Sequence, residues 1–279
     1  MITQPCHGAQ IGQYGVMRQQ RLVFGEVAEL YDKARAAYPD ALIDDVIGFA
    51  GADGAGLRAL EVGAGTGKAT VGFAARGLEI LALEPSAAMA AVAMRNCQQF
   101  PGVRIEPASF EGWPAEPGGF GLLYSAQAWH WVQPEVRYQK AAEVLAPGGT
   151  LALFWHRTRW QGEQLRDELE SLYLRLVPGL HAKRPGFPGL AFPRTDGAAG
   201  EEIRETGLFT GETERTYPWP ATFTADSFID LLQTQSDHRM LSEDTRTELF
   251  GGVREIIANH GGAVVIPHAT LLVLARLRA

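Results

Sequence analysis

Hydrophobic positions in the first half of the chain alternate between short continuous runs and longer stretches with helical spacing. Short apolar runs between turn signals are typical of buried strands. Stretches in which apolar side chains recur every three to four residues predict amphipathic helices that cover a sheet. We therefore expect strands at 57–62, 79–83, 103–107, 120–124 and 150–155, and helices at 42–50, 67–76, 86–96 and 134–145.

The second half of the chain has a less regular pattern. Thr224 and Ser242 are residue types that favour helix N-caps, and each precedes an amphipathic stretch. We expect further helices at 164–176 and 201–205, a strand at 212–217 and a long closing strand at 263–276.

Strands that alternate with helices of this length form βαβ units, which build a parallel sheet with right-handed crossovers. The pattern therefore predicts an α/β fold with one sheet and helical insertions, rather than two independent domains. The expected parts are a loose arm at 1–23, a core at 24–156, and a remainder at 157–279 that completes the sheet and carries lid insertions at 157–200 and 219–261.

Composition narrows the class of protein. The chain has 279 residues, 46% of them hydrophobic, which excludes a largely disordered protein. No apolar run reaches the ~18 residues that span a membrane, and residues 1–20 lack the apolar core of a signal peptide. A net charge of −7 argues against binding to nucleic-acid phosphates. We expect a cytoplasmic monomer or homodimer with no nucleic-acid or membrane partner.

A glycine-rich loop, Glu-Val-Gly-Ala-Gly-Thr-Gly at 61–67, follows one predicted strand and opens a helix. Glycine lets a ligand approach the backbone closely. A phosphate-binding P-loop is excluded because Val62 and Ala69 stand where that motif needs Gly and Ser or Thr. A dinucleotide fingerprint is weakened because Lys68 replaces its third glycine. The third ligand is S-adenosylmethionine, whose ammonium group Glu61 is placed to meet.

Glu84 ends the second predicted strand, about 20 residues after the loop begins. An acidic residue at this place accepts hydrogen bonds from ribose hydroxyl groups. Taken alone, Glu84 could equally be a surface residue in front of Pro85. The glycine loop upstream favours the ribose interpretation.

Four motifs in order resemble those of the class I S-adenosylmethionine-dependent methyltransferases. They are 61–67, Leu-Glu-Pro-Ser at 83–86, Phe-Gly-Leu-Leu-Tyr at 120–124 and Val-Leu-Ala-Pro-Gly-Gly at 144–149. Residues 24–39 also resemble the N-terminal helical segment of the small-molecule branch. The resemblance implies a Rossmann-like, seven-stranded, mostly parallel sheet whose last strand is antiparallel.

The resemblance also implies how S-adenosylmethionine would be held. The three glycines of the loop wrap its amino-acid part, Glu84 holds the ribose and Met89 lines the adenine. Ser109 stands where many relatives have Asp, so Phe110 is the better-supported adenine contact. The expected cofactor-binding residues are Tyr31, Arg35, Glu61, Gly63, Ala64, Gly65, Thr66, Gly67, Glu84, Pro85, Met89, Ser109, Phe110, Glu111, Ser125 and Gln127.

Methyl transfer from a sulfonium needs mainly proximity and alignment, and a base only where the acceptor keeps its proton. His130, after the fourth strand, and His156, at the end of the fifth, are the candidate catalytic bases. Of Trp129 and Trp131, the alternation predicts that one faces the ligand and one the core. No His, Cys or Asp set has the spacing of a metal site, so we expect no metal.

The acceptor remains open at this point. The acidic-Pro-Pro-aromatic motif typical of amino-group methylation on DNA or protein is missing after the fourth strand. This favours an in-line methyl transfer to a small molecule on oxygen, nitrogen or carbon. One alternative is a non-catalytic protein that senses S-adenosylmethionine. Another, a nicotinamide-dependent oxidoreductase, is disfavoured by Lys68.

Overall fold

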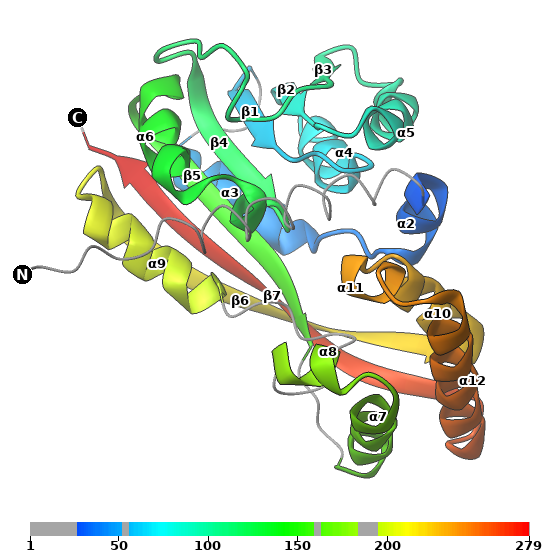
Figure 1. Cartoon of the computed structure of the whole chain (residues 1–279). Coiled ribbons are helices and arrows are strands. Elements are labelled where there is room, and N and C mark those ends of the chain that lie inside the picture. Colours follow the sequence, from blue (N-terminus) through cyan, green and yellow to red (C-terminus); the bar gives the residue numbers. More distant parts are fainter. Residues whose placement is uncertain (1–26, 52–55, 159–162, 184–194, 279) are drawn as a thin grey trace, which may run out of the picture.

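The computed structural model describes residues 27–51, 56–158, 163–183 and 195–278. The arm expected at 1–23 lies outside them. Seven strands form one sheet through the described residues (Figure 1). The strands are β1 (Arg58–Val62), β2 (Glu79–Leu83), β3 (Val103–Glu106), β4 (Phe120–Ala126), β5 (Leu145–Thr158), β6 (Phe209–Thr224) and β7 (Ala263–Leu277).

The strands lie in the order β3-β2-β1-β4-β5-β7-β6. Neighbours among β1 to β5 are parallel, and β7 runs antiparallel to both β5 and β6. The predicted Rossmann-like sheet with an antiparallel last strand is therefore confirmed. The last strand does not form the edge of the sheet, because β6 pairs along its outer side from Phe209 to Thr224.

The predicted caps begin their helices. The side chains of Ser86, Thr224 and Ser242 each accept a hydrogen bond from the backbone amide three residues ahead. Such a bond satisfies one of the free amides in the first helical turn. The helices are α2 (Ala28–Ala34), α3 (Asp40–Ala50), α4 (Lys68–Ala74), α5 (Ala87–Cys97), η2 (Trp129–Trp131), α6 (Pro134–Val144), α7 (Glu163–Leu176), α8 (Pro178–Lys183), α9 (Thr195–Thr206), α10 (Ala225–Gln233), α11 (Ser236–Arg239) and α12 (Glu243–Asn259).

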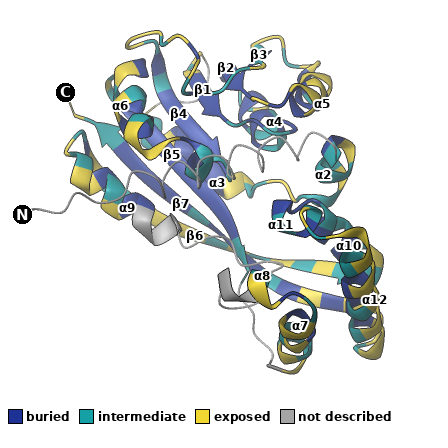
Figure 2. Cartoon of the chain, in the orientation of Figure 1, coloured by how far each residue is buried: buried dark blue, intermediate teal, exposed yellow. Residues whose placement is uncertain are grey.

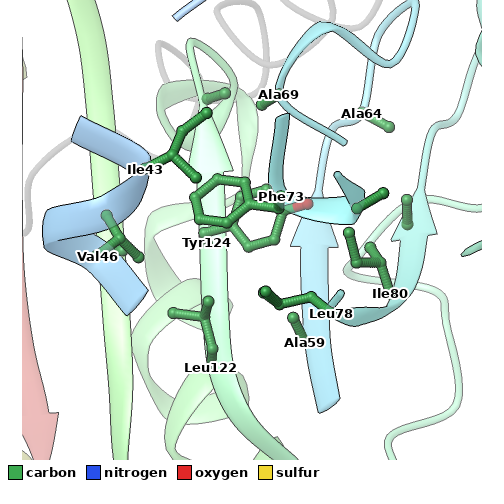
Figure 3. Packing of buried hydrophobic residues seen from close by; sticks show 14 of the residues in the cluster. Ile43, Val46, Ala59, Ala64, Ala69, Phe73, Leu78, Ile80, Leu122 and Tyr124 are labelled. Carbon is green, nitrogen blue, oxygen red and sulfur yellow. The ribbon is translucent and has the colours of Figure 1, made fainter. Parts of the chain in front are cut away.

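Helices cover both faces of the sheet. α3, α4 and α5 pack on one face, and α6 and α9 pack on the other. On the first face the rings of Phe73 and Tyr124 lie with their centroids 4.2 Å apart, beside Ile43 and Val46 of α3 (Figure 3). The central strands are buried along most of their length (Figure 2). This packing holds the carboxyl ends of β1, β2, β4 and β5 as one rigid edge.

A separate hydrophobic cluster gathers α7, α10 and α12 on the far ends of β6 and β7 (Figure 1). The second insertion, expected from 219, begins only at Ala225 because β6 stays paired through Thr224. In the first insertion, α9 packs on the sheet through Ala199 and Ile203 rather than on this cluster. We call residues 225–239, which form α10 and α11, the lid.

Within the described ranges, no helix is both long enough and apolar enough to cross a membrane.

Candidate functional site

A cavity lies at the carboxyl ends of β1, β2, β4 and β5, closed on the other side by α2 and the lid. In an open α/β sheet this edge is where ligands bind, because the loops after parallel strands meet there. Most of the residues predicted from the sequence line it. They are Tyr31, Arg35, Gly63, Ala64, Gly65, Thr66, Glu84, Pro85, Met89, Phe110, Gln127, His130 and His156.

Five predicted cofactor residues do not line the cavity: Glu61, Gly67, Ser109, Glu111 and Ser125. The Ser125 hydroxyl donates to the backbone carbonyl of Val62, the last residue of β1, at 2.7 Å. The Ser109 hydroxyl accepts a backbone amide within its own turn, and the Glu111 carboxylate accepts one from the start of α6. These three side chains hold loops in place instead of facing the cavity.

The glycines of the loop have different tasks. All three adopt left-handed backbone conformations, with φ between 59° and 85°. A Cβ at Gly63 would lie 2.3 Å from Ala128 Cβ, and one at Gly67 would press on α5 at 3.3 Å. A Cβ at Gly65 would meet only the end of Met89, at 3.8 Å. Gly63 and Gly67 are therefore required by packing, whereas Gly65 turns open backbone toward the cavity.

Glu84 binds the loop to the second strand. One carboxylate oxygen accepts the amide of Gly65 and the other accepts the amide of Ser86, both at 2.8 Å. Charge-assisted bonds of this kind are stronger than bonds between neutral groups. The Glu84 carboxylate is thus fixed in the cavity wall, at the place where the sequence predicted ribose binding.

Glu61 is fully buried behind the loop. Its Oε2 accepts hydrogen bonds from the Thr70 and Tyr124 hydroxyl groups, at 2.6 and 2.9 Å. Its Oε1 has no hydrogen-bond partner among the described residues. Burial raises the pKa of Glu61 from 4.5 to about 7. Its contact with a ligand ammonium stays a prediction, for which Oε1 is the available atom.

Gln127 occupies a strained position at the end of β4. With φ at 59°, it is the one non-glycine residue in the left-handed region across the described chain. The buried Oε1 of Gln127 has no hydrogen-bond partner among the described residues. The hydroxyl oxygen of Thr66 has none among them either. Such strain and such unpartnered polar atoms cluster at ligand sites. Together with the open backbone of Gly65, they give the cavity wall unused hydrogen-bonding groups for a polar cofactor.

His156 lies in the wall but is a poor base. Burial lowers its pKa to about 3, with Coulombic contributions from His268, Arg35 and Arg157. Its Nδ1 is 2.9 Å from the Thr270 hydroxyl, which accepts the Trp219 indole N–H at 3.0 Å. Because a hydroxyl has one hydrogen and two lone pairs, the Thr270 side chain fits either tautomer of the ring. With a pKa of about 3, the His156 ring is neutral at physiological pH.

The segment that follows β4 divides its aromatic residues as the alternation predicted. Trp129 is buried in the core, with its ring 6.0 Å from that of Phe110. Trp131 lines the cavity, and so does His130, whose ring is 4.8 Å from that of Trp131. His130 is therefore the candidate base that remains.

Arg35 joins α2 to the lid. It lines the cavity, and its predicted contact with the cofactor stays a prediction. Its Nε donates to the Thr234 hydroxyl at 2.8 Å and its Nη2 to the Thr234 carbonyl at 3.4 Å. Lys33 and Asp230 form an ion pair between the same two elements at 3.2 Å. Figure 1 shows α2 beside α10 and α11. These contacts close one side of the cavity.

Sequence reasoning missed four polar lining residues: Tyr38, Lys68, Gln235 and Ser236. Tyr38 stacks on His156 with ring centroids 4.6 Å apart, and Gln235 and Ser236 reach the cavity from the lid. The Thr224 cap marked the start of α10, but nothing local shows that the other end of this helix lies over the site.

Within the parts of the chain that the structure describes, no group of three or more His, Cys, Asp or Glu side chains could hold a metal ion.

Comparisons with known proteins match this geometry. Residues 59–149 match the family model of a methyltransferase domain. An uncharacterized methyltransferase of Mycobacterium tuberculosis is 28% identical over 265 residues, which cover 93% of this chain and 98% of that protein. A probable S-adenosylmethionine-dependent methyltransferase of Saccharomyces cerevisiae is 29% identical over 132 residues, 45% of this chain and 43% of its own.

Solved structures show the same fold. A structure from Anaeromyxobacter dehalogenans, assigned to the type II methyltransferases, superposes with a TM-score of 0.59 at 22% identity, covering 88% of this chain and 99% of its own. A Haemonchus contortus N-methyltransferase with bound S-adenosylhomocysteine gives a TM-score of 0.53 at 14% identity. The match covers 91% of this chain and 58% of that protein. The motifs, the sheet order and these relatives together support a class I S-adenosylmethionine-dependent methyltransferase.

Proposed function

We propose that this chain binds S-adenosylmethionine in the cavity and transfers its methyl group to a small-molecule acceptor by in-line displacement. The observation that carries the proposal is the wall formed by Gly65, Glu84 and Gln127. It offers open backbone, a fixed carboxylate and a buried amide oxygen without a partner among the described residues. When bound, the cofactor supplies a methyl group already activated by its sulfonium.

Some lining residues would hold the cofactor, and others would enclose the two reactants. Glu84 is positioned to accept ribose hydroxyl groups, and Phe110 and Met89 offer apolar surface for the adenine. Gly65 lets the amino-acid part approach the backbone. Holding both reactants in one closed space supplies the alignment that a displacement needs.

The cover over one side of the cavity supports a small acceptor. The Arg35–Thr234 and Lys33–Asp230 contacts bring α2 and the lid together over one side. A cover of this kind helps to keep water from the reacting groups. A polymer would need a groove open at both ends, which these contacts oppose.

Calorimetry with S-adenosylhomocysteine tests binding, and methyl-labelled S-adenosylmethionine tests turnover. The label is incubated with the protein and a metabolite extract of the organism that carries the chain. We expect saturable binding and a labelled product of low molecular mass. Binding without any labelled product would favour the sensor, and absence of binding would refute the proposal.

A further inference from the structure

A buried hydrogen bond joins the first insertion to the lid. The hydroxyl of Tyr173, in α7, lies 2.6 Å from Nε2 of His238, in α11. Both side chains are fully buried, although the two residues are 65 positions apart in the chain. Neither of them lines the cavity, so the pair stands outside the site described above.

Apolar side chains surround this pair. The His238 ring lies edge-on to that of Tyr173, with centroids 5.7 Å apart, and stacks on Phe250 of α12 at 6.2 Å. Tyr173 belongs to the hydrophobic cluster that gathers α7, α10 and α12. A polar group in such surroundings has lost its hydration, so losing its hydrogen bond costs more than the same loss at the surface. The bond therefore fixes how α11 sits on α7.

Two residues of the lid just before His238 lie in the wall of the cavity. They are Gln235 and Ser236, and both are buried. The Ser236 carbonyl accepts the Met240 amide at 3.1 Å. The Gln235 carbonyl accepts the Arg239 amide at 3.1 Å as well. These bonds close one helical turn around His238, so a movement of its side chain also moves the two wall residues.

The same segment is held from its other side. The Thr234 hydroxyl accepts Nε of Arg35, in α2, at 2.8 Å. The stretch 235–236 thus lies between an anchor on α2 and an anchor on α7. A short stretch that is fixed at both ends keeps its side chains in one place, which is what a precise binding wall requires.

The sheet order places the lid across the cavity from the cofactor motifs. The glycine loop follows β1 and Glu84 follows β2, whereas the lid leaves β6 and returns through α12 to β7. In the sheet, β4 and β5 lie between these two pairs of strands. A methyl acceptor over β4 and β5 therefore has the cofactor on one side and Gln235 and Ser236 on the other.

From this arrangement we propose that Gln235 and Ser236 contact the methyl acceptor, and that the Tyr173–His238 bond holds them in position. The inference rests on the proposed function. An amide and a hydroxyl can both donate and accept hydrogen bonds, which suits a hydroxyl or carbonyl group on the acceptor. Tyr173 and His238 are then positioning residues, and α7 takes part in acceptor recognition without lining the cavity.

Removing the Tyr173 hydroxyl tests the bond with little change of shape. Tyr173→Phe is assayed with methyl-labelled S-adenosylmethionine and a dilution series of the metabolite extract. The amount of extract that gives half the maximal rate should rise about tenfold, which corresponds to the loss of one buried hydrogen bond. S-adenosylhomocysteine affinity, measured by calorimetry, should stay within about twofold of the wild type.

Tyr138→Phe is the matched control. Tyr138 is also buried and donates to the Glu202 carboxylate at 2.7 Å, but it joins α6 to α9 and does not line the cavity. The control should need the same amount of extract as the wild type. An equal rise in both variants would overturn the proposal, because it would report a general loss of stability.

Variants of His238 test whether the two residues act through their shared bond. His238→Gln places an amide near the former Nε2 and should stay within about threefold of the wild type. His238→Phe has no polar atom and should behave like Tyr173→Phe. Combining His238→Phe with Tyr173→Phe should cause no further rise, since the bond is already lost. Effects that multiply in the double variant would overturn the proposal.

The remaining outcomes separate this proposal from the proposed function. An unchanged requirement for extract in Tyr173→Phe would show that the bond is only structural. A fall of about tenfold or more in S-adenosylhomocysteine affinity would assign the lid wall to the cofactor instead. A wild-type protein that binds no S-adenosylhomocysteine, or forms no labelled product, would refute the proposed function and this inference together.

Discussion

The Glu84 carboxylate accepts the backbone amide of Gly65 at 2.8 Å, so that the end of β2 holds the loop that follows β1. The same carboxylate accepts the amide of Ser86, the N-cap of α5. One side chain therefore sets the relative position of the loop and the next helix. Any ligand that touches Glu84 also touches the residue that shapes the loop.

Replacing Glu84 with Gln should weaken S-adenosylhomocysteine binding by about 1.5–3 kcal/mol. The amide has one accepting atom, so either the Gly65 or the Ser86 amide would face a donor. Calorimetry measures the affinity. Glu116→Gln, which removes an exposed ion pair with Arg58, is the control. Equal affinity in both variants would mean that Glu84 does not shape the site.

Gly65→Val should abolish measurable cofactor binding while the protein stays folded. The new side chain would fill the open side of the loop, where a Cβ meets only Met89 at 3.8 Å. Gly118→Val is a matched control because Gly118 has a similar φ of 64° and open space around it, but lies outside the cavity. Both variants should lose comparable stability, about 1–2 kcal/mol for the left-handed backbone. A Gly65→Val protein that binds as tightly as the control contradicts the expected backbone contact.

Glu61→Gln should change how stability depends on pH. The folded pKa of Glu61 is about 7, above its ordinary 4.5. Between these values the folded state binds more protons than the unfolded state, so the unfolding free energy falls as pH rises through this window. The difference between a pKa of 4.5 and one of about 7 sets an upper limit of about 3.4 kcal/mol on this change in unfolding free energy.

Gln is a close substitute at this position because both donors, Thr70 and Tyr124, contact Oε2 and an amide oxygen can accept both. Urea unfolding of the wild type and Glu61→Gln at about pH 5 and about pH 8 measures the effect. The variant should gain stability relative to the wild type at the higher pH. If the unfolding free energies of the variant and the wild type differ by the same amount at both pH values, Glu61 does not have a raised pKa in the folded protein.

Thr234→Val should loosen the lid. The Thr234 hydroxyl accepts Arg35 Nε at 2.8 Å and donates to the Leu231 carbonyl at 2.6 Å, and valine keeps the shape without these bonds. Amide exchange across 225–239 should accelerate roughly tenfold, which corresponds to a loss of about 1.4 kcal/mol in the free energy of local opening. Thr213→Val, at an exposed position of strand β6, is the control and should leave the exchange rate of 225–239 unchanged.

The same exchange experiment tests closure by ligand. Saturation with S-adenosylhomocysteine should protect 27–38 and 225–239 in the wild type, beyond the protection of the glycine loop. Exchange that is unaffected in both segments would mean that α2 and the lid are packing elements only.

Local patterns in the sequence determined most of the core. The apolar runs and capped helices specified the βαβ order, because burial and helix capping depend on residues close together in the chain. The four motifs indicated the family for a related reason: each is a short continuous segment of a strand, a turn or both. The N-caps Ser86, Thr224 and Ser242 and the strand at 79–83 agree with the structure.

The tertiary structure alone decided which of those residues face the cavity and what closes it. Glu61, Ser109 and Ser125 were predicted to bind the cofactor, yet their hydrogen bonds go to other parts of the fold. Glu61 accepts from α4 and β4, Ser109 accepts within its own turn, and Ser125 donates to β1. Arg35 and Thr234 are 199 residues apart, and Gln235 reaches the site only because β6 and β7 carry α10 back over the edge of the sheet. Contacts between such distant segments depend on the packing of whole elements, which no local pattern of side chains encodes.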